Sequence, residues 1–227
     1  MLAREGFGII ITASLIGLGL IVLGLWLGGY WAFMIIFGLL VAAFTLWFFR
    51  DPKRTPPHEA GAGDLILAPA DGKIVEIVEE EEPLFIRGQA RRLSIFLSPL
   101  NVHVNRIPVD GTIEYAEYVP GEYLVAWHPK ASSKNERSEL GLRHEDGTKV
   151  VFKQIAGAVA RRIVYHIRVG DIVKAGDRFG IVKFGSRMDV IVPPHVTFTA
   201  KVGDRVMAGV TVIGRLPATT GADAEQN

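Results

Sequence analysis

Two short stretches in the C-terminal third of the chain repeat one another. Residues 169–177 read VGDIVKAGD, and residues 202–209 read VGDRVMAG. Each stretch is typical of a strand, a Gly-Asp turn, a second strand and another glycine turn. Glycine reaches the positive φ values that tight turns between twisted strands require. The repeat therefore predicts two matching turn units within a β-rich fold.

These two stretches are similar to the hammerhead turns of lipoyl and biotinyl carrier domains, a resemblance that implies a flattened barrel of two facing sheets. From Leu65 onward, short β-branched runs alternate with turn residues. The expected strands are 73–78, 92–97, 111–118, 149–154, 189–192 and 211–213. This spacing favours a mainly β barrel or sandwich over residues 65–216. We expect the acidic run 79–82 in a solvated loop or hairpin end, and residues 217–227 in a disordered tail.

The N-terminal segment has a different character, because no residue from Gly6 to Phe49 is charged. A membrane-spanning helix needs about 20 apolar residues, and this stretch is about twice as long, with an interruption, GGYW, at residues 28–31. We predict a transmembrane helical hairpin with helices over residues 7–27 and 31–49, so that residues 1–50 form a membrane anchor. One long tilted helix is the alternative.

Basic residues flank this segment on both sides, with Arg4 before it and Arg50, Lys53 and Arg54 after it. Basic flanks stay in the cytoplasm, and a hairpin places both flanks on one side. The sequence therefore predicts a cell-membrane protein whose soluble domain faces the cytoplasm. Prolines over residues 51–64 predict a stiff, extended linker between anchor and domain.

The composition excludes several classes of site. The chain has no cysteine among its 227 residues, which rules out disulfides, thiolate zinc sites, iron–sulfur clusters and a cysteine nucleophile. A net charge of +1 indicates neither a nucleic-acid binder nor an acidic tail. The histidines show no spacing that is typical of a metal site. From the charge and from this spacing, we expect neither nucleic acid nor a metal ion as a ligand.

Four sequence blocks follow one another along the chain. They read FFRDP at 48–52, APADGKI at 68–74, FLSPLNVHVNR at 96–106 and FGSRMD at 184–189. Together with QIAGAVARRI at 154–163, they resemble phosphatidylserine decarboxylase in its shorter branch. The resemblance covers about residues 46 to 215. A Gly-Ser pair alone is more typical of an ordinary turn, and only the whole set of blocks gives it meaning.

The resemblance implies a proenzyme that cuts itself between Gly185 and Ser186. Such a cut needs an activated hydroxyl and a strained or exposed amide, and Gly185 has no Cβ to keep the hydroxyl of Ser186 away. Attack gives an ester, and elimination then frees residues 1–185. Residue 186 becomes a pyruvoyl group on the shorter chain, and the two chains, α and β, stay together as a heterodimer.

The pyruvoyl ketone is the implied cofactor. It can form a Schiff base with the amine of a serine headgroup and accept the electrons released as carbon dioxide leaves. The implied activity is a carboxy-lyase that converts phosphatidylserine into phosphatidylethanolamine, with a phospholipid substrate and the membrane as partners. Ester- and ether-linked lipids, and the oligomeric state, remain open.

The resemblance also implies which residues move protons. It places the family's catalytic aspartate at Asp71 and a functional histidine at His103. A neutral imidazole suits the base of cleavage and the acid of reprotonation, and Asp71 would orient it or hold its charge. The ordinary alternatives are a structural Asp-Gly turn and a histidine without chemistry. Arg161 and Arg162 could bind a lipid phosphate, or form a solvated or membrane-surface patch.

Two positions depart from the longer branch of this family. The second histidine of that branch is Arg106 here, so the base role passes to His103. A threonine that follows the cleavage serine in that branch is Arg187 here.

Two other classes of protein remain to be weighed. A membrane-anchored, non-enzymatic adaptor or carrier with a hammerhead domain would need a modifiable lysine at a turn. A zinc endopeptidase of the lysostaphin type would need His-x-His, and His103-Val104-Asn105 does not provide it.

Overall fold

The computed structural model describes residues 2–28, 32–57, 64–128, 130–158, 163–182 and 185–217. The chain divides into two compact units, residues 1–53 and residues 54–227. The first is helical and the second is mainly β.

The N-terminal unit is a pair of apolar helices. A short 3-10 helix, η1 (Arg4–Gly6), leads into α1 (Phe7–Trp26), and α2 (Ala32–Phe48) follows. Both lie within the predicted ranges 7–27 and 31–49, so the alternative of one long helix is wrong. The helices cross at two glycines: a Cβ on Gly17 would lie 2.8 Å from the carbonyl oxygen of Gly38. Small residues allow such close backbone approach between membrane helices.

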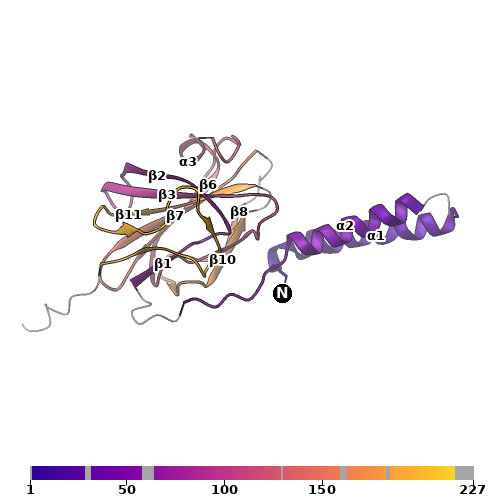
Figure 1. The fold of residues 1–227 in the computed structure, drawn as a ribbon, viewed down its shortest axis with the longest axis horizontal. Coiled ribbons are helices and arrows are strands. Elements are labelled where there is room, and N and C mark those ends of the chain that lie inside the picture. Colours follow the sequence, from indigo (N-terminus) through magenta and orange to yellow (C-terminus); the bar gives the residue numbers. More distant parts are fainter. Residues whose placement is uncertain are drawn as a thin grey trace, which may run out of the picture. The chain divides into compact units, whose positions relative to one another are not determined.

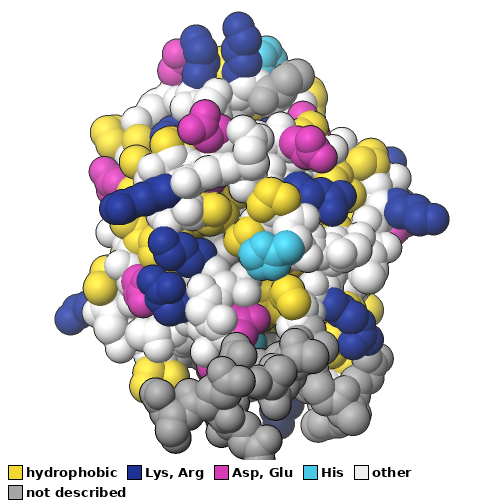
Figure 2. Space-filling view, turned by 90° about the vertical axis from the view of Figure 1, so that its left-hand side faces the viewer, with side chains coloured by type: hydrophobic (Ala, Val, Ile, Leu, Met, Phe, Trp, Pro, Cys, Tyr) yellow, Lys and Arg dark blue, Asp and Glu magenta, His cyan; other side chains and the backbone are white. Residues whose placement is uncertain are grey.

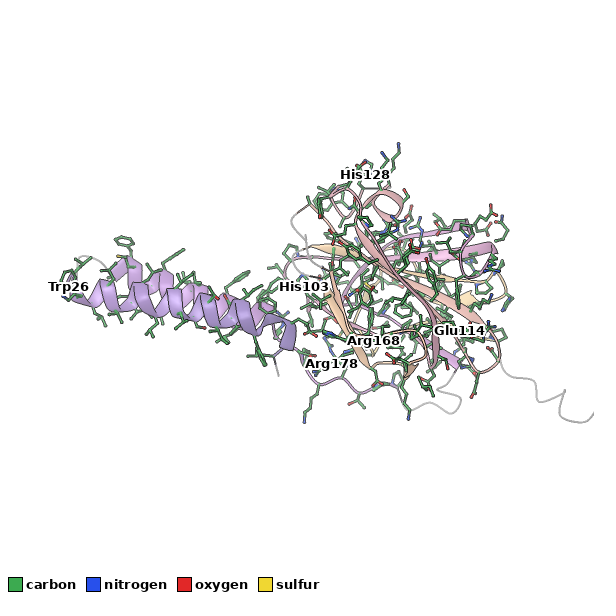
Figure 3. The ribbon with its side chains drawn as sticks, turned by 180° about the vertical axis from the view of Figure 1, so that it is seen from behind. Trp26, His103, Glu114, His128, Arg168 and Arg178 are labelled. Atoms are coloured by element: carbon green, nitrogen blue, oxygen red, sulfur yellow. The ribbon has the colours of Figure 1, made fainter. Side chains whose placement is uncertain are left out.

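The two ends of this unit are joined by backbone hydrogen bonding. The N–H of Ala3 donates to the carbonyl oxygen of Phe49 at 2.9 Å, and Leu2 and Arg50 form an antiparallel bridge. Trp26 lies at the opposite end, next to the turn (Figure 3). The chain therefore enters and leaves the helix pair at the same end.

Most side chains of both helices face outward. Leu25, for example, is 68% exposed. An exposed apolar surface of this extent is unusual for a soluble unit. Helix α1, with 20 residues, is long and apolar enough to cross a membrane, since it rises about 30 Å. Helix α2 is apolar but shorter, with 17 residues.

The second unit is built from short antiparallel strands. They are β1 (Leu65–Leu67), β2 (Gly72–Glu82), β3 (Gly88–Leu97), β4 (Val104–Arg106), β5 (Gly111–Val119), β6 (Arg137–Arg143), β7 (Lys149–Ile155), β8 (Ile163–Tyr165), β9 (Ile172–Val173), β10 (Arg178–Val182), β11 (Ser186–Val192), β12 (Thr197–Phe198), β13 (Arg205–Val206) and β14 (Val212–Arg215), with a short helix α3 (Ala131–Lys134) before β6. The six predicted strands overlap β2, β3, β5, β7, β11 and β14.

One large sheet organises this unit. Its eight strands run in the order β13-β2-β3-β11-β7-β6-β5-β9, and it curls into an antiparallel half-barrel (Figure 1). Two smaller sheets have the orders β4-β10-β8 and β1-β14-β12. Figure 2 shows acidic, basic and apolar side chains interspersed over one face, as expected for a chain with a net charge of +1.

The core lies on the inner, concave side of the large sheet. Alternate residues of its two central strands are buried there, namely Leu93, Ile95 and Leu97 on β3 and Met188, Val190 and Val192 on β11. The sheet β4-β10-β8 covers this inner side: the rings of Phe152 on β7 and Phe179 on β10 meet edge to face, 5.1 Å apart. Burial of these side chains is the main stabilising contribution to the domain.

The two repeated stretches form the same turn. Gly170 and Gly203 have φ values of +95° and +103°, which confirms the predicted positive φ. In each turn the aspartate that follows the glycine accepts a hydrogen bond of 2.8 Å from the backbone N–H three residues earlier. One local sequence pattern therefore gives one local structure twice.

The acidic run 79–82 lies at the hairpin end of β2, where it pairs with the start of β3, so of the two expected settings the hairpin end is confirmed. Glu82, the last residue of the strand, is only 2% exposed. Its carboxylate accepts the backbone N–H groups of Leu84, Phe85 and Ile86 in the following turn. Charge-assisted hydrogen bonds of this kind compensate the loss of water around a buried carboxylate.

Candidate active site

The predicted cleavage site lies at one end of the large sheet. Ser186 is the first residue of β11 and pairs with Leu97, the last residue of β3, while Arg187 pairs with Ile155 at the end of β7. Asp71 directly precedes β2, whose Lys73 pairs with Phe96. The segments that follow β3 and β7 and those that precede β2 and β11 therefore meet at the same end.

Ser186 is buried on the inner side of the sheet. Successive side chains of a strand point to opposite faces, and Met188 and Val190, on the same face as Ser186, belong to the core. The Ser186 hydroxyl has no hydrogen-bond partner among the residues that the structure describes. A buried polar group is normally hydrogen-bonded, and this hydroxyl is an exception. Because no described group donates to it, its lone pairs are available for chemistry.

Gly185 supplies the conformation that this position requires. Its φ is +72°, a region that residues with a Cβ rarely occupy. A Cβ placed on Gly185 would lie 3.7 Å from Pro99, which indicates ordinary contact with the segment after β3. Glycine is therefore needed here because of its backbone conformation, and the neighbouring space is already lined by Pro99.

A second glycine, Gly157, lies against the carbonyl oxygen of Gly185. A Cβ on Gly157 would stand well inside van der Waals contact of that oxygen, and 3.3 Å from the Cβ of Ala126. Only a residue without a side chain fits between them. Sequence reasoning assigned no role to Gly157; its place in the QIAG block was the only available signal.

His103 lies close to this site in the topology. It directly precedes β4, and Val104 pairs with Ile181 on β10, the strand that leads to Gly185. His103 is 1% exposed. Residues two apart on an extended segment face the same side, and Asn105 faces the large sheet, where it accepts a hydrogen bond from Gln154. We therefore expect His103 to face the large sheet as well.

Asp71 is bound by two groups. One carboxylate oxygen accepts the backbone N–H of Ala208 at 2.8 Å, and the other forms an ion pair with Arg54 at 2.8 Å. Both oxygens therefore have partners other than His103. Strand β3 separates β2 from β11, so the Cα atoms of Asp71 and Ser186 lie about two strand spacings apart, roughly 10 Å. Sequence reasoning had used Arg54 only for membrane orientation.

The remaining sequence-predicted residues fall into two groups. Arg106, at the second histidine position of the longer branch, is nearly buried, and its guanidinium donates to the carbonyl oxygen of Gly176 at 2.8 Å. It therefore supports the first of the repeated turns. Arg161 and Arg162 lie outside the described residues.

A buried polar chain runs along the inner side beside the site. The hydroxyl of Ser138 donates to the side-chain oxygen of Gln154 at 2.9 Å, and the amide nitrogen of Gln154 donates to Asn105 at 2.8 Å. Gln154 pairs with Met188 in the ladder between β7 and β11. This chain links the large sheet to β4, the strand that follows His103.

The outer side of β11 carries a cluster of charged side chains. Arg187 is 1% exposed and donates to Asp189 at 2.9 Å, to Ser94 at 2.6 Å and to Glu76. Arg92 also donates to Glu76 and Ser94, at 2.8 and 2.6 Å. Apart from the departure at Arg187, no sequence pattern pointed to this cluster.

The cluster changes the acidity of its members. Burial opposes the ionisation of Glu76, but hydrogen bonds from Arg187 and Arg92 outweigh it and lower the pKa of this carboxyl. Burial likewise opposes the charged form of Arg92, but the charges of Asp189 and Glu80 outweigh it and raise the pKa of the guanidinium. The charged forms of both groups are therefore the stable ones at neutral pH.

The described residues contain no group of three or more His, Asp or Glu side chains arranged to hold a metal ion. The arrangement at the start of β11 offers other chemistry: a nucleophilic hydroxyl, an adjacent backbone carbonyl, and an imidazole on a neighbouring segment.

Comparison with known proteins identifies the family. A family model described as phosphatidylserine decarboxylase matches residues 41–214. The phosphatidylserine decarboxylase proenzyme of Salinibacter ruber is 69% identical over 176 residues, 77% of each chain. That of Symbiobacterium thermophilum is 44% identical over 217 residues, 96% of each chain, and that of Chlorobium phaeobacteroides is 44% identical over 215 residues, 94% of this chain and 99% of the relative. The chain therefore belongs to the phosphatidylserine decarboxylase family.

Proposed function

We propose that the chain cuts itself between Gly185 and Ser186 and then decarboxylates phosphatidylserine to phosphatidylethanolamine at the new N-terminus. Proenzymes of this family work with a covalent pyruvoyl group. The observation that carries the proposal is the Ser186 hydroxyl, which is buried without a described hydrogen-bond partner and directly follows a glycine at φ +72°.

The residues at the start of β11 can carry out the cut. The Ser186 hydroxyl attacks the carbonyl carbon of Gly185, and His103 takes the hydroxyl proton as general base. The amide bond breaks and an ester forms. Loss of the Cα proton of residue 186 then breaks its Cβ–Oγ bond, and Gly185 leaves as the carboxylate end of the large chain. Tautomerisation of residue 186 and hydrolysis by water release ammonia.

The site suits the pyruvoyl group that this sequence of steps leaves. The group would form at residue 186, whose side chain is buried on the inner side without a described hydrogen-bond partner. When present, it supplies an electron sink for the bond to the departing carboxylate. His103 holds the proton that returns to the substrate Cα.

Asp71 and Arg54 act on the charge of the site. The carboxylate of Asp71 would orient His103 or hold its charge, as the acid does in a Ser-His-Asp arrangement. Arg54 and the N–H of Ala208 hold that carboxylate in place. Asp71 therefore acts through His103 rather than on the substrate.

The helix pair anchors the enzyme where its substrate lies. Both ends of the pair are joined, and basic residues flank both ends, namely Arg50 and Lys53 on one side and Arg4 on the other. These features support a transmembrane hairpin with both ends in the cytoplasm. Residues 51–64 then tether a decarboxylase domain of residues 65–216, and tethering raises the effective concentration of a lipid substrate. Arg161 and Arg162 are candidates for contact with the lipid phosphate.

The two chains stay together after the cut. All seven residues of β11 pair with β3 on one side, and five of them, 187–191, also pair with β7 on the other. The paired Gly-Asp turns, at Gly170 and Gly203, support a hammerhead-like barrel in which one turn belongs to each chain.

Intact-mass measurement of the purified protein tests this proposal, with Ser186→Ala as the matched variant. We expect two fragments divided between residues 185 and 186, with an N-terminal pyruvoyl group on the smaller one and an uncut variant. Vesicles that contain phosphatidylserine should release carbon dioxide only with the cut protein. A folded wild-type chain that stays whole would contradict the proposal and favour the adaptor alternative.

A further inference from the structure

We propose that Arg187 is a positioning residue that clamps the pyruvoyl-bearing end of the small chain to the large chain after self-cleavage. The inference rests on the proposed cut between Gly185 and Ser186. It concerns the residue that directly follows the reactive position and whose side chain points to the opposite face of the sheet.

The first step of the argument is what Arg187 contacts. Its guanidinium is fully buried and donates to Asp189 on its own strand, to Ser94 on β3 and to Glu76 on β2. Three acceptors in a fixed arrangement suit the planar guanidinium, which is rigid once its donors are engaged. The side chain therefore spans two neighbouring strands from a single point on β11.

The second step is where the cut falls. Glu76 and Ser94 precede Gly185 and belong to the large chain, whereas Arg187 and Asp189 belong to the small one. The same hydrogen bonds that lie within one chain before cleavage connect two chains afterwards. Arg187 is the second residue of the small chain, so these connections act next to its N-terminus.

The third step is what the cut removes. Before cleavage, the start of β11 is held by the peptide bond to Gly185 as well as by its ladder. Afterwards it is a chain terminus, and termini fray unless side chains hold them. A pyruvoyl group on a fraying end would leave its position beside His103. A displacement of about 1 Å can cost roughly a hundredfold in rate, so anchorage at residue 187 acts directly on catalysis.

Arg92 strengthens the clamp from the large chain. It donates to Glu76 at 2.8 Å, to Ser94 at 2.6 Å and to Glu80 at 2.6 Å, and it lies 3.7 Å from Asp189. Glu76 and Ser94 are thus held in place whether or not the peptide bond to Gly185 is intact. The two acceptors that the large chain offers to Arg187, Glu76 and Ser94, are therefore arranged in advance by residues of that chain alone.

The test compares Arg187→Met with the wild type in two backgrounds, one that cuts itself and one made uncut by Ser186→Ala. The full chain in detergent is followed by hydrogen exchange at the amides of residues 187–189. In the cutting background we expect Arg187→Met to leave cleavage intact, to raise exchange at these amides by about tenfold or more, and to lower kcat by about a hundredfold with little change in KM. In the uncut background we expect these amides to stay protected.

Two further variants keep the result interpretable. Glu76→Gln with Arg187→Gln removes opposite charges together, so the net charge of the cluster is unchanged if Arg187→Met alone does not fold. Arg143→Met removes an arginine from an exposed pair with Glu114, and should change neither exchange nor kcat. Equal loosening of residues 187–189 in both backgrounds, or unchanged exchange and kcat after the cut, would overturn the clamp. An uncut wild type would instead refute the proposed function.

Discussion

Ser186 and Arg187 are consecutive residues in opposite surroundings. The Ser186 hydroxyl faces the inner side of the sheet and has no hydrogen-bond partner among the described residues. The Arg187 guanidinium faces the outer side and has three. Both side chains are buried, so burial does not distinguish them. What differs is whether their polar groups are already satisfied.

The difference shows how one strand can be both reactive and rigid. A nucleophile needs lone pairs that no protein donor occupies, and a buried group in that condition costs stability. The alternation of a β-strand places the next side chain on the other face, where a saturated ion cluster can hold the same backbone. In the proposed mechanism, the reactive residue and the anchoring residue are therefore next to each other on one strand.

The largest effect is expected on the rate of self-cleavage, from a substitution at Gly157 beside the Gly185 carbonyl. Gly157→Ala places a methyl group against the carbonyl oxygen of Gly185. The Gly185 carbonyl must then leave its present position, and a shift of about 1 Å should slow self-cleavage by roughly a hundredfold. The measurement is the rate at which the two fragments appear on a denaturing gel after synthesis.

Gly88→Ala is the matched control for this substitution. Gly88 also lies at the end of a strand, but a Cβ there would meet no atom within 4 Å. Cleavage of this variant should proceed at the wild-type rate. If Gly157→Ala cleaved as fast as Gly88→Ala, the close approach at the carbonyl oxygen would have no functional meaning.

A smaller effect is expected from the polar chain on the reactive face. Gln154→Met keeps the length of the side chain but leaves Ser138 and Asn105 without their shared partner. Loss of such a buried partner typically costs about 1–3 kcal/mol in the free energy of unfolding. Urea denaturation of the uncut Ser186→Ala form measures it, because that form is a single chain. A variant as stable as its parent would show that water replaces the amide.

Local patterns predicted the elements whose residues carry a clear signal. The uncharged N-terminal run predicted two helices, and β-branched runs predicted six strands that the structure contains. The repeated Gly-Asp turns were visible because glycine at positive φ is a local requirement. Strand β6 escaped prediction because Arg137 and Glu139 interrupt its apolar residues; Glu139 is nevertheless buried, with ion pairs to Arg137 and Lys153.

Local sequence patterns could not predict contacts between segments that are distant along the chain. The resemblance indicated Gly185, Ser186, His103 and Asp71, but not that Gly157 lies against the Gly185 carbonyl or that Arg54 binds Asp71. Nothing in the residues around 187 indicates Glu76 and Ser94 as its partners, because they lie on other strands. Such pairings depend on sheet order and register, which the sequence alone did not supply.

The smallest effect is expected when acid protonates the carboxylates around Arg187, on the outer side of the sheet. Hydrogen bonds from Arg187 and Arg92 outweigh burial and lower the pKa of Glu76 below its usual value of 4.5. A lowered pKa in the folded state means that Glu76 contributes stability above about pH 4.5, and that this contribution is lost as pH falls through the folded pKa. Glu80 and Asp189 also face these arginines, and the side chain of Glu76 is 29% exposed, so neighbouring carboxylates and water limit its share.

Glu76→Gln in the uncut form isolates this contribution, because glutamine does not titrate. The difference in the free energy of unfolding between parent and variant should be constant from pH 7 to about pH 5 and shrink below the 4.5 of the unfolded carboxyl. A difference that stays constant down to pH 3 would mean that Glu76 does not depend on its charge to hold Arg187. A difference that shrinks as predicted would assign this part of the acid sensitivity to the ionisation of Glu76, which pairs with both Arg187 and Arg92.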